Sequence, residues 1–346
     1  MNDPKDRVDT MWVLVTGGAG FIGAHTCIEL LSNGYKVVVI DNLSNSTRVS
    51  LDRVMDITNN SIEFFHDDVR DTNALNQIFS NFDIGAVIHF AGLKAVGESV
   101  DKPLEYYDIN ISGTINLCKV MDAFKVKKLV FSSSATVYGE PDVVPIKENF
   151  PLSVTNPYGR SKLIIEEVLR DLYVSDKDWN IALLRYFNPI GAHDSGLIGE
   201  DPTGKPNNIM PYITQVAVGI QDKLKIFGND YETKDGTGMR DYIHVVDLAK
   251  GHVAAIESMS QFENIATVNL GTGIGYTVLE LVNAFEAATG IAIPYEFVDR
   301  RPGDVARCYA DVSLAKELLG WQSEKTLVDM CRDAWNWQSK NPNGYQ

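Results

Sequence analysis

Residues 16–23 of the chain read Thr16-Gly17-Gly18-Ala19-Gly20-Phe21-Ile22-Gly23, with a glycine at every third position from Gly17. The apolar residues 12–15 before them are typical of a buried parallel strand. Residues 22–31 after them are typical of a helix that ends at Asn33-Gly34, and residues 36–40 form a second apolar run. The glycines therefore lie at a strand-to-helix turn inside a βαβ unit. Such a turn lets the backbone approach a pyrophosphate, so it predicts a dinucleotide site.

The choice of cofactor depends on Asp41, which ends the second predicted strand. An acidic residue about 20 positions after the glycine turn is typical of a ribose-binding carboxylate. A carboxylate there accepts hydrogen bonds from the ribose hydroxyls and repels a 2′-phosphate, so we expect NAD rather than NADP. An Asp at this place can also cap a turn. We favour the cofactor role because the glycine turn precedes it.

A second pattern is formed by Tyr158 and Lys162, with Ser134 upstream. Residues four apart share one face of a helix, here predicted to begin at Pro157. A free phenol has a pKa of about 10 and is a poor base at neutral pH, but a fixed ammonium group favours the phenolate. Tyr and Lys at this spacing are common on solvated helices. Together with the glycine turn, however, the pair predicts a general base.

Bulk composition limits the other functions. The 346 residues carry a formal net charge of −15, which argues against nucleic acid or an anionic membrane as a partner. The four cysteines are scattered and the six histidines lack ligand spacing, so we expect neither disulfides nor a metal. Residues 1–11 are polar and charged, which fits neither a signal peptide nor a membrane span. We expect a soluble, cytoplasmic protein.

The order of predicted elements indicates the fold. Strands and helices alternate to about residue 190, which predicts an α/β fold with a doubly wound parallel sheet. We expect a Rossmann domain over residues 11–190 and a smaller α/β substrate domain over residues 191–346, with segments near 242–270 returning to the first domain. In such sheets ligands bind beyond the carboxyl ends of the strands. The candidates at those ends are Gly17, Asp41, Ala91, Ser134 and Asn188.

Further motifs point to one family. They are Ser132-Ser133-Ser134-Ala135-Thr136-Val137-Tyr138-Gly139, Arg185-Tyr186-Phe187-Asn188-Pro189-Ile190-Gly191, Asn207-Asn208-Ile209-Met210-Pro211, Gly238-Met239-Arg240-Asp241-Tyr242-Ile243-His244 and Arg301-Pro302-Gly303-Asp304. With the glycine turn and the Tyr–Lys pair, they resemble the extended short-chain dehydrogenase/reductase family and, within it, the UDP-hexose 4-epimerases. The resemblance covers essentially the whole chain after Met11, and a match to all motifs in order is highly specific.

The resemblance implies an isomerase that interconverts UDP-glucose and UDP-galactose. Tyr158, ionised beside Lys162 and the nicotinamide, takes the proton of the sugar 4-hydroxyl, and Ser134 helps to relay it. Hydride passes from C4 to NAD⁺, the 4-keto sugar turns about its pyrophosphate, and the hydride returns to the other face. Binding of the remote UDP keeps the intermediate in place. The resemblance also implies a homodimer formed by helices over residues 106–124 and 158–174.

The resemblance further implies the site residues. The cofactor contacts are Gly17, Gly20, Phe21, Ile22, Gly23, Asp41, Asn42, Asn45, Ser46, Asp68, Val69, Phe90, Ala91, Lys94, Asn110, Tyr158, Lys162 and Tyr186. The substrate contacts are Lys94, Ser134, Tyr158, Asn188, Asn208, Ile209, Lys225, Phe227, Arg240, Arg301, Asp304 and Cys308. Guanidinium groups suit a pyrophosphate, so Arg240 and Arg301 are expected to hold it. For Lys225, Phe227 and Asn110 a purely structural role is about as well supported.

Two other functions share the fold. Sugar-nucleotide 4,6-dehydratases and decarboxylases place acidic residues just after the fifth strand, whereas this chain has Ser134-Ala135-Thr136 there and no carboxylate. Non-catalytic dinucleotide-sensing regulators commonly lack the Tyr or the Lys, and both are present here. We therefore prefer 4-epimerisation to either alternative.

Substrate breadth is expected to depend on Cys308, seven positions after Arg301. In the family this position lies near the C2 substituent of the sugar, where Tyr restricts the substrate and a small residue admits N-acetylated sugars. We hypothesise that UDP-GlcNAc and UDP-GalNAc are also interconverted. Two alternatives stay open: Cys308 is an ordinary buried thiol, or a one-residue shift makes the adjacent Tyr309 face the sugar.

Overall fold

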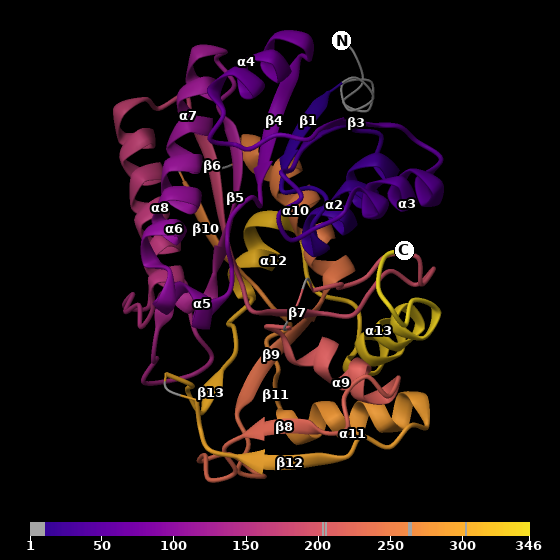
Figure 1. Cartoon of the computed structure of the whole chain (residues 1–346). Coiled ribbons are helices and arrows are strands. Elements are labelled where there is room, and N and C mark those ends of the chain that lie inside the picture. The colour runs from indigo at the N-terminus through magenta and orange to yellow at the C-terminus, as the bar shows by residue number, and fades with distance from the viewer. Residues whose placement is uncertain (1–10, 203, 205, 262–264, 302) are drawn as a thin grey trace.

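The protein is described by a computed structural model over residues 11–202, 204, 206–261, 265–301 and 303–346. The polar segment 1–10 and Pro302 of the Arg301–Asp304 motif lie outside the described residues. A seven-stranded parallel sheet forms the centre, in the order β10-β6-β5-β4-β1-β2-β3 (Figure 1). Its strands are β1 (Trp12–Thr16), β2 (Lys36–Ile40), β3 (Ile62–Phe65), β4 (Ile84–His89), β5 (Lys128–Ser134), β6 (Asn180–Tyr186) and β10 (Ala266–Leu270).

Helices cover both faces of this sheet (Figure 1). One face carries α2 (Phe21–Ser32), α3 (Arg48–Thr58) and α10 (Val245–Ser258), and the other carries α4 (Thr72–Asn81), α7 (Gly113–Ala123) and α8 (Pro157–Ser175). Side chains alternate along a strand, so Val13 and Val15 of β1 pack into the first layer and Leu14 into the second. Because both layers are apolar, the strands read as continuous apolar runs. The predicted doubly wound α/β class is confirmed.

The helix expected over residues 106–124 differs in detail. A helical segment begins earlier, with α6 (Pro103–Tyr107), and continues through the π-turn η1 (Asp108–Ser112) into α7. Pro103 stands in the first turn, where proline is favoured. A π-turn inserts one extra residue into a helix and re-aims the side chains there. The turn contains Asn110, whose side chain reaches into the site described below.

The second part of the molecule has its own small sheets and core. The strands β7 (Asn188–Ile190), β9 (Met239–His244), β11 (Gly275–Thr277) and β13 (Arg307–Cys308) form one sheet, and β8 (Leu224–Phe227) pairs with β12 (Tyr295–Val298). The helices α9 (Ile209–Ala217), α11 (Val278–Thr289) and α13 (Leu327–Lys340) pack around a separate apolar cluster. Between α9 and α11 the chain returns to the first part: α10 packs in the core of the first part, and β10 pairs with β6.

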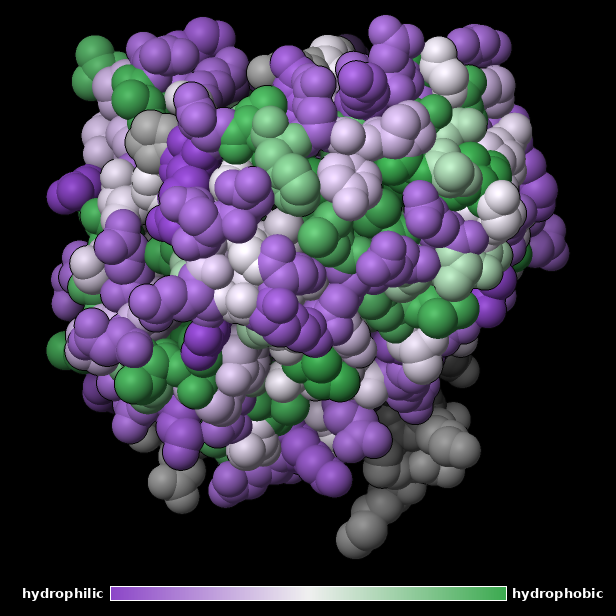
Figure 2. Space-filling view, turned by 90° about the horizontal axis from the view of Figure 1, so that it is seen from below, coloured by the Kyte–Doolittle hydropathy of each residue, from purple (hydrophilic) through white to green (hydrophobic). Residues whose placement is uncertain are grey.

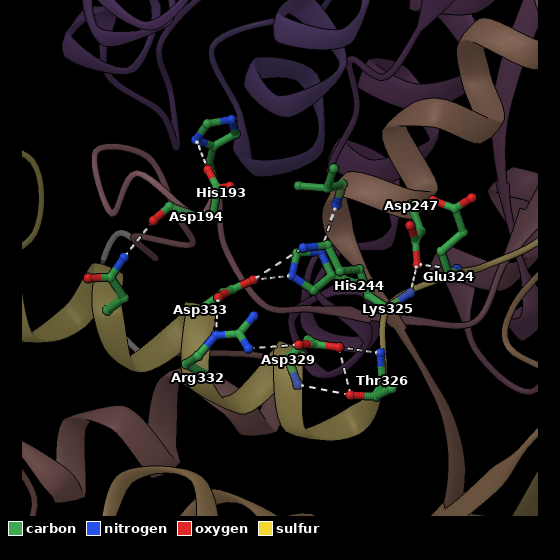
Figure 3. A network of polar contacts seen from close by, with 12 residues as sticks. His193, Asp194, His244, Asp247, Glu324, Lys325, Thr326, Asp329, Arg332 and Asp333 are labelled. Atoms are coloured by element: carbon green, nitrogen blue, oxygen red, sulfur yellow. Dashed lines mark hydrogen bonds and ion pairs between the residues drawn. The ribbon is translucent and has the colours of Figure 1, made fainter.

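Buried polar contacts join the two parts where β9 meets α10 (Figure 3). His244 is fully buried, and its Nε2 lies 3.2 Å from Oδ2 of Asp333 on α13. Asp247, in the first turn of α10, accepts the amide N–H groups of Glu324 and Lys325 at 2.9 and 2.8 Å. These contacts attach the C-terminal helix to the start of α10.

The outer surface is mixed in character. Seen from below, hydrophilic residues cover much of the face and hydrophobic residues lie in small groups between them (Figure 2). Within the part of the chain that the structure describes, no helix is long and apolar enough to cross a membrane.

Candidate active site

The glycine turn lies between β1 and α2, and it leaves space at the helix N-terminus. Gly17 has φ +70°, and a Cβ placed on it would lie 2.8 Å from the amide nitrogen of Ala91. A Cβ on Gly23 would lie 2.3 Å from the carbonyl oxygen of Gly17. Only glycine fits these two positions. Gly20 caps α2 without a side chain that would occupy the amide groups, so the turn fits a diphosphate.

Asp41 follows β2 and faces the same turn. Its Oδ2 accepts the amide N–H of Ala19 at 3.0 Å, and its Oδ1 accepts the amide of Leu43 and the hydroxyl of Ser46, both at 2.9 Å. The turn-capping alternative is therefore realised. A carboxylate has about four acceptor positions, so one on Oδ2 is left for a ribose hydroxyl. The two roles of Asp41 are compatible.

The next acidic candidate, Asp68, is bonded within the chain. Its carboxylate accepts from the Arg70 guanidinium at 2.9 Å and from Nδ2 of Asn42 at 2.9 Å. The hydrogen bonds from Arg70 lower the pKa of Asp68 to about 2. Val69, beside it, is buried against Gly113. The contacts of Asn42, Asn45, Asp68 and Val69 with a cofactor stay predictions.

Tyr158 and Lys162 lie on one face of α8, at the carboxyl edge of the sheet. The helix begins with Asn156, whose side chain accepts the amide of Gly159 at 2.9 Å. Lys162 is only 5% exposed, and its Nζ donates to the carbonyl oxygen of Ser132 at 2.7 Å. The same Nζ is 6.0 Å from the centroid of the Tyr158 ring. The predicted pair is thus assembled beside the end of β5.

Burial shifts the pKa values of both groups. It lowers the pKa of Lys162 to about 8. It raises the pKa of Tyr158, and a hydrogen bond with the Ser134 side chain only partly opposes that rise. The expectation that the neighbouring ammonium of Lys162 favours the phenolate stays a prediction.

Two arginines meet at the edge of the second part. Nε of Arg301 donates to Oδ2 of Asp304 at 2.9 Å, and Nη2 of Arg240 lies 3.7 Å from Oδ1 of Asp304. Arg240 is also held by the carbonyl oxygen of Val305 at 2.8 Å. The Arg301 guanidinium lies 4.7 Å from the ring centroid of Phe227. One carboxylate therefore orients both guanidinium groups, which leaves donors for an anionic ligand.

Cys308 lies in β13, opposite Arg240 of β9. Its side chain packs against the apolar cluster that contains Val137 and Tyr138, a few residues after Ser134. Tyr309 lies on the other side, close to Gly275 of β11. Burial raises the pKa of the Cys308 thiol to about 11, so the thiol is neutral. Cys308 and Tyr309 thus pack on different neighbours, and which of them faces the sugar stays a prediction.

Comparison with known proteins agrees with this geometry. The family model described as GDP-mannose 4,6 dehydratase matches residues 14–334. The chain is 59% identical over 336 residues to UDP-glucose 4-epimerase of Bacillus subtilis (strain 168), covering 97% of this chain and 99% of that one. It is 58% identical over 340 residues to UDP-glucose 4-epimerase of Homo sapiens, covering 96% and 98%.

The chain belongs to the UDP-glucose 4-epimerase family. A solved structure of UDP-glucose 4-epimerase from Bifidobacterium longum, in complex with NAD+ and UDP, has 56% sequence identity and a TM-score of 0.93. The match covers 97% of this chain and 100% of that chain. The predicted family resemblance is confirmed.

The segment after Ser134 carries hydroxyl groups and no carboxylate. It forms the short helix η2 (Ala135–Tyr138), in which the Ser134 hydroxyl accepts from the amide and the hydroxyl of Thr136 at 3.2 and 2.9 Å. The polar groups here are hydroxyls, as the sequence indicated. A hydroxyl beside Tyr158 can orient and relay a proton, whereas removal of a proton from carbon requires a stronger base.

Sequence reasoning missed Glu200, which connects two predicted residues. Its Oε1 accepts from Nδ2 of Asn208 at 2.6 Å and lies 3.5 Å from Nζ of Lys94. Its Oε2 is buried and has no partner among the described residues, and burial raises its pKa. The glycine-rich loop 196–202 carries no periodicity, so nothing in the sequence distinguished this carboxylate from an ordinary loop residue.

Asn110 has a structural place in the site. Its Oδ1 accepts the amide of Leu93 at 2.8 Å, and its Nδ2 donates to the Ser161 hydroxyl at 3.0 Å. It therefore holds the turn that follows β4 against α8, and its direct contact with a cofactor stays a prediction. Among the residues that the structure covers, no group of three or more His, Cys, Asp or Glu could hold a metal ion.

The remaining candidates line the same two parts. Phe21 and Ile22 begin α2 in its first turn, and Phe90, Ala91 and Lys94 follow β4. Asn188 begins β7, Ile209 begins α9, and Lys225 lies in β8. In the register of the main sheet, Tyr186 at the end of β6 stands opposite Ser134. The cofactor candidates thus gather at the carboxyl edge of the main sheet, and most of the substrate candidates lie in the second part.

Proposed function

We propose that this chain is a UDP-hexose 4-epimerase that interconverts UDP-glucose and UDP-galactose. The observation that carries the proposal is the placement of Tyr158, Lys162 and Ser134 at the carboxyl edge of the sheet, beside a glycine turn with room for a diphosphate. Membership of the UDP-glucose 4-epimerase family supports the same activity.

The chain supplies the proton chemistry. In the proposed reaction the ionised oxygen of Tyr158 takes the proton of the sugar 4-hydroxyl and later returns it, with Ser134 bonded to both. Bound NAD⁺ would supply a reversible hydride acceptor for C4 and a positive charge near the phenol. We assign the diphosphate of NAD to the Gly17–Gly23 turn and a ribose hydroxyl to the open acceptor position of Asp41. The relative from Bifidobacterium longum, crystallised with NAD+ and UDP, supports this choice of ligands.

We propose that the second part holds the UDP portion. Asp304 orients Arg240 and Arg301 so that their remaining donors suit a pyrophosphate. Asn188, Asn208 and the residues near them are assigned to the nucleotide. Binding energy from this distant portion keeps the sugar in place while it turns, because the sugar itself must be held loosely.

We also propose that UDP-GlcNAc and UDP-GalNAc are substrates. The support is that Cys308 packs against the apolar cluster that contains Val137 and Tyr138, whereas the larger Tyr309 lies close to Gly275 of β11. A small residue leaves space for an N-acetyl group at C2.

We infer that the protein works as a homodimer in the cytoplasm. Apolar side chains are exposed on the outer helices of one side, namely Val100 on α5 (Val96–Asp101), Leu104 on α6 and Val174 on α8. Leu104 is 82% exposed, which is unfavourable for a leucine unless another surface covers it. These elements adjoin the helices that the sequence assigned to the dimer.

The activity is tested by incubating the purified protein with each of the four UDP-hexoses and separating the products. We expect C4 epimers only, without added dinucleotide, because NAD is expected to remain bound during purification. The Tyr158→Phe variant should still bind UDP but turn over about 10²–10⁴ times more slowly. A dehydrated or decarboxylated product, or bound NAD with no turnover of any UDP-hexose, would contradict the proposal.

A further inference from the structure

A fully buried histidine lies directly behind the proposed cofactor site. His252 is in the middle of α10, and its Nε2 is 2.5 Å from the hydroxyl oxygen of Tyr186 at the end of β6. Its ring centroid is 5.1 Å from that of Tyr186 and 4.8 Å from that of Phe90. His252 thus contacts two residues that the sequence assigned to the dinucleotide, although it is far from both in the chain.

The hydrogen bonds around His252 have a fixed direction. Nδ1 lies 2.8 Å from the carbonyl oxygen of Leu248, which can only accept, so Nδ1 carries the proton. Nε2 of the neutral ring must then accept from the Tyr186 hydroxyl. The Ser132 side chain in turn donates to the Tyr186 oxygen and partly offsets the burial that raises the pKa of that phenol. Because burial lowers the pKa of His252 to about 4, the ring is neutral in the physiological range.

This chain of donors and acceptors ends next to the reacting groups. The carbonyl of Ser132 accepts from Nζ of Lys162, and Tyr186 stands opposite Ser134 in the β5–β6 register. A displaced Tyr186 ring would therefore disturb both the cofactor side and the Lys162 side of the crevice. His252 lies on α10, which belongs to the segment that returns from the second part to the first. The position of the Tyr186 ring therefore depends on how α10 packs.

We propose that His252 is a positioning residue of the cofactor site, which fixes the Tyr186 hydroxyl and the Phe90 ring and thereby the place of the nicotinamide portion of NAD. It does not exchange protons with the substrate. This inference rests on the proposed function, because it takes Tyr186 and Phe90 as contacts of the dinucleotide.

A double-mutant cycle tests the inference. His252→Phe keeps an aromatic ring but removes the acceptor of the Tyr186 hydroxyl, and Tyr186→Phe removes the hydroxyl itself. We expect His252→Phe to lower kcat about tenfold with little change in KM for the UDP-hexose, because displaced Tyr186 and Phe90 side chains would misplace the nicotinamide relative to the sugar. In the Tyr186→Phe background the same change should cause almost no further loss, because its target is already absent. His252→Gln, which offers an acceptor oxygen at a similar reach, should restore most of kcat.

Two measurements other than turnover decide the same question. One is the amount of dinucleotide that stays bound through gel filtration, and the other is the absorbance of reduced cofactor that forms when a UDP-hexose is added. His252→Phe should lower the first and change the second. Additive kcat losses in the double variant, or unchanged dinucleotide retention and absorbance in His252→Phe, would overturn the inference.

A matched control is Trp321→Phe. Trp321 is also buried, and its Nε1 donates to the carbonyl oxygen of Asp247 on the same helix α10 at 3.0 Å. Neither Trp321 nor Asp247 is assigned to the dinucleotide. This variant should lower the melting temperature without changing the cofactor absorbance. If the wild-type protein does not epimerise any UDP-hexose, the proposed function fails, while dinucleotide retention in the variants still decides the role of His252.

Discussion

The Lys162 ammonium group is buried, and burial disfavours its positive charge. Burial lowers its pKa from 10.5 to about 8, yet below that pH the ammonium persists, bonded to the carbonyl of Ser132. The proposed base Tyr158 depends on this cation, since burial raises the pKa of the phenol. The protonation of one lysine should therefore limit the reaction at alkaline pH.

The pH dependence of turnover checks this dependence on Lys162. We expect kcat to fall as pH rises above about 8, because Lys162 then loses the charge that favours the phenolate. Lys162→Arg should lower activity but lack this alkaline decline, since a guanidinium remains protonated to a pKa above about 12. Folding stability should change in the opposite sense: between the folded pKa of about 8 and the unfolded value of 10.5, the unfolded chain binds more protons, so stability rises with pH. A flat kcat profile across this range for the wild type would contradict the prediction.

The selectivity assigned to Cys308 is tested by substitution with the bulkier residue. Cys308→Tyr should keep activity on UDP-glucose and UDP-galactose and lose about 100-fold or more on UDP-GlcNAc and UDP-GalNAc, because the larger ring fills the space for the N-acetyl group. Tyr309→Phe serves as the control and should leave the ratio of the two activities unchanged, since Tyr309 lies near β11. Equal losses on both sugar pairs in Cys308→Tyr would remove Cys308 from this role.

Some residues of the site could be predicted from the sequence and others could not, and the difference has a physical reason. Asp41, Tyr158 and Lys162 lie at fixed distances from recognisable turns and helix starts, so their spacing predicts their place. The roles of Glu200 and His252 depend on partners that are distant in the chain, such as Tyr186, which is 66 positions from His252. A histidine on the buried side of α10 also looks like any other residue of an apolar helix.

At the scale of elements, α8 is attached to the sheet by a buried carboxylate. Glu166 lies on the same helical face as Tyr158 and Lys162 and is fully buried. Its oxygens accept from Nε and Nη2 of Arg185 on β6, at 2.9 and 2.6 Å, and from the hydroxyl of Ser133 on β5 at 2.5 Å. The helix that carries the proposed base is therefore fixed to two neighbouring strands.

Removal of this carboxylate should be strongly destabilising. Glu166→Ala leaves the buried guanidinium of Arg185 without its partner, and we expect a loss of about 3–5 kcal/mol in the free energy of unfolding. Arg170→Ala is the control, because Arg170 lies 3.5 Å from the same carboxylate but is partly exposed, and should cost about 1 kcal/mol or less. Urea unfolding of the three proteins gives the comparison. Similar losses of unfolding free energy in both variants would show that the buried Glu166–Arg185 pair contributes no more to stability than the exposed Arg170 contact.

Regular elements were predictable from the sequence, and irregular ones were not. The strand over 36–40 has the expected bounds, because apolar β-branched runs mark buried strands directly. The π-turn at Asp108–Ser112 and the short strands β7, β11 and β13 have no periodicity of their own. They are set by contacts with distant segments, so a local pattern does not contain them.

At the scale of the whole molecule, the exposed apolar side chains of α5, α6 and α8 should be covered by a second copy. Leu104→Glu places a charge in the proposed interface, and we expect it to shift the protein from dimer to monomer in sedimentation analysis. Ile220→Glu is the control, since Ile220 is also exposed but lies beyond α9, away from these helices. A wild-type protein that sediments as a monomer, or an unchanged mass in Leu104→Glu, would contradict the proposed dimer.

The return of α10 and β10 to the main sheet affects how the protein is made. As the chain leaves the ribosome, residues 12–186 can form six of the seven strands, but β10 and α10 appear only after more than fifty further residues have been translated. Until then β6 is an open edge, and the apolar face that α10 covers is exposed to solvent. The nascent chain therefore passes through a state that is nearly complete and still prone to aggregation, so folding of its first part cannot finish before about half of the second has been synthesised.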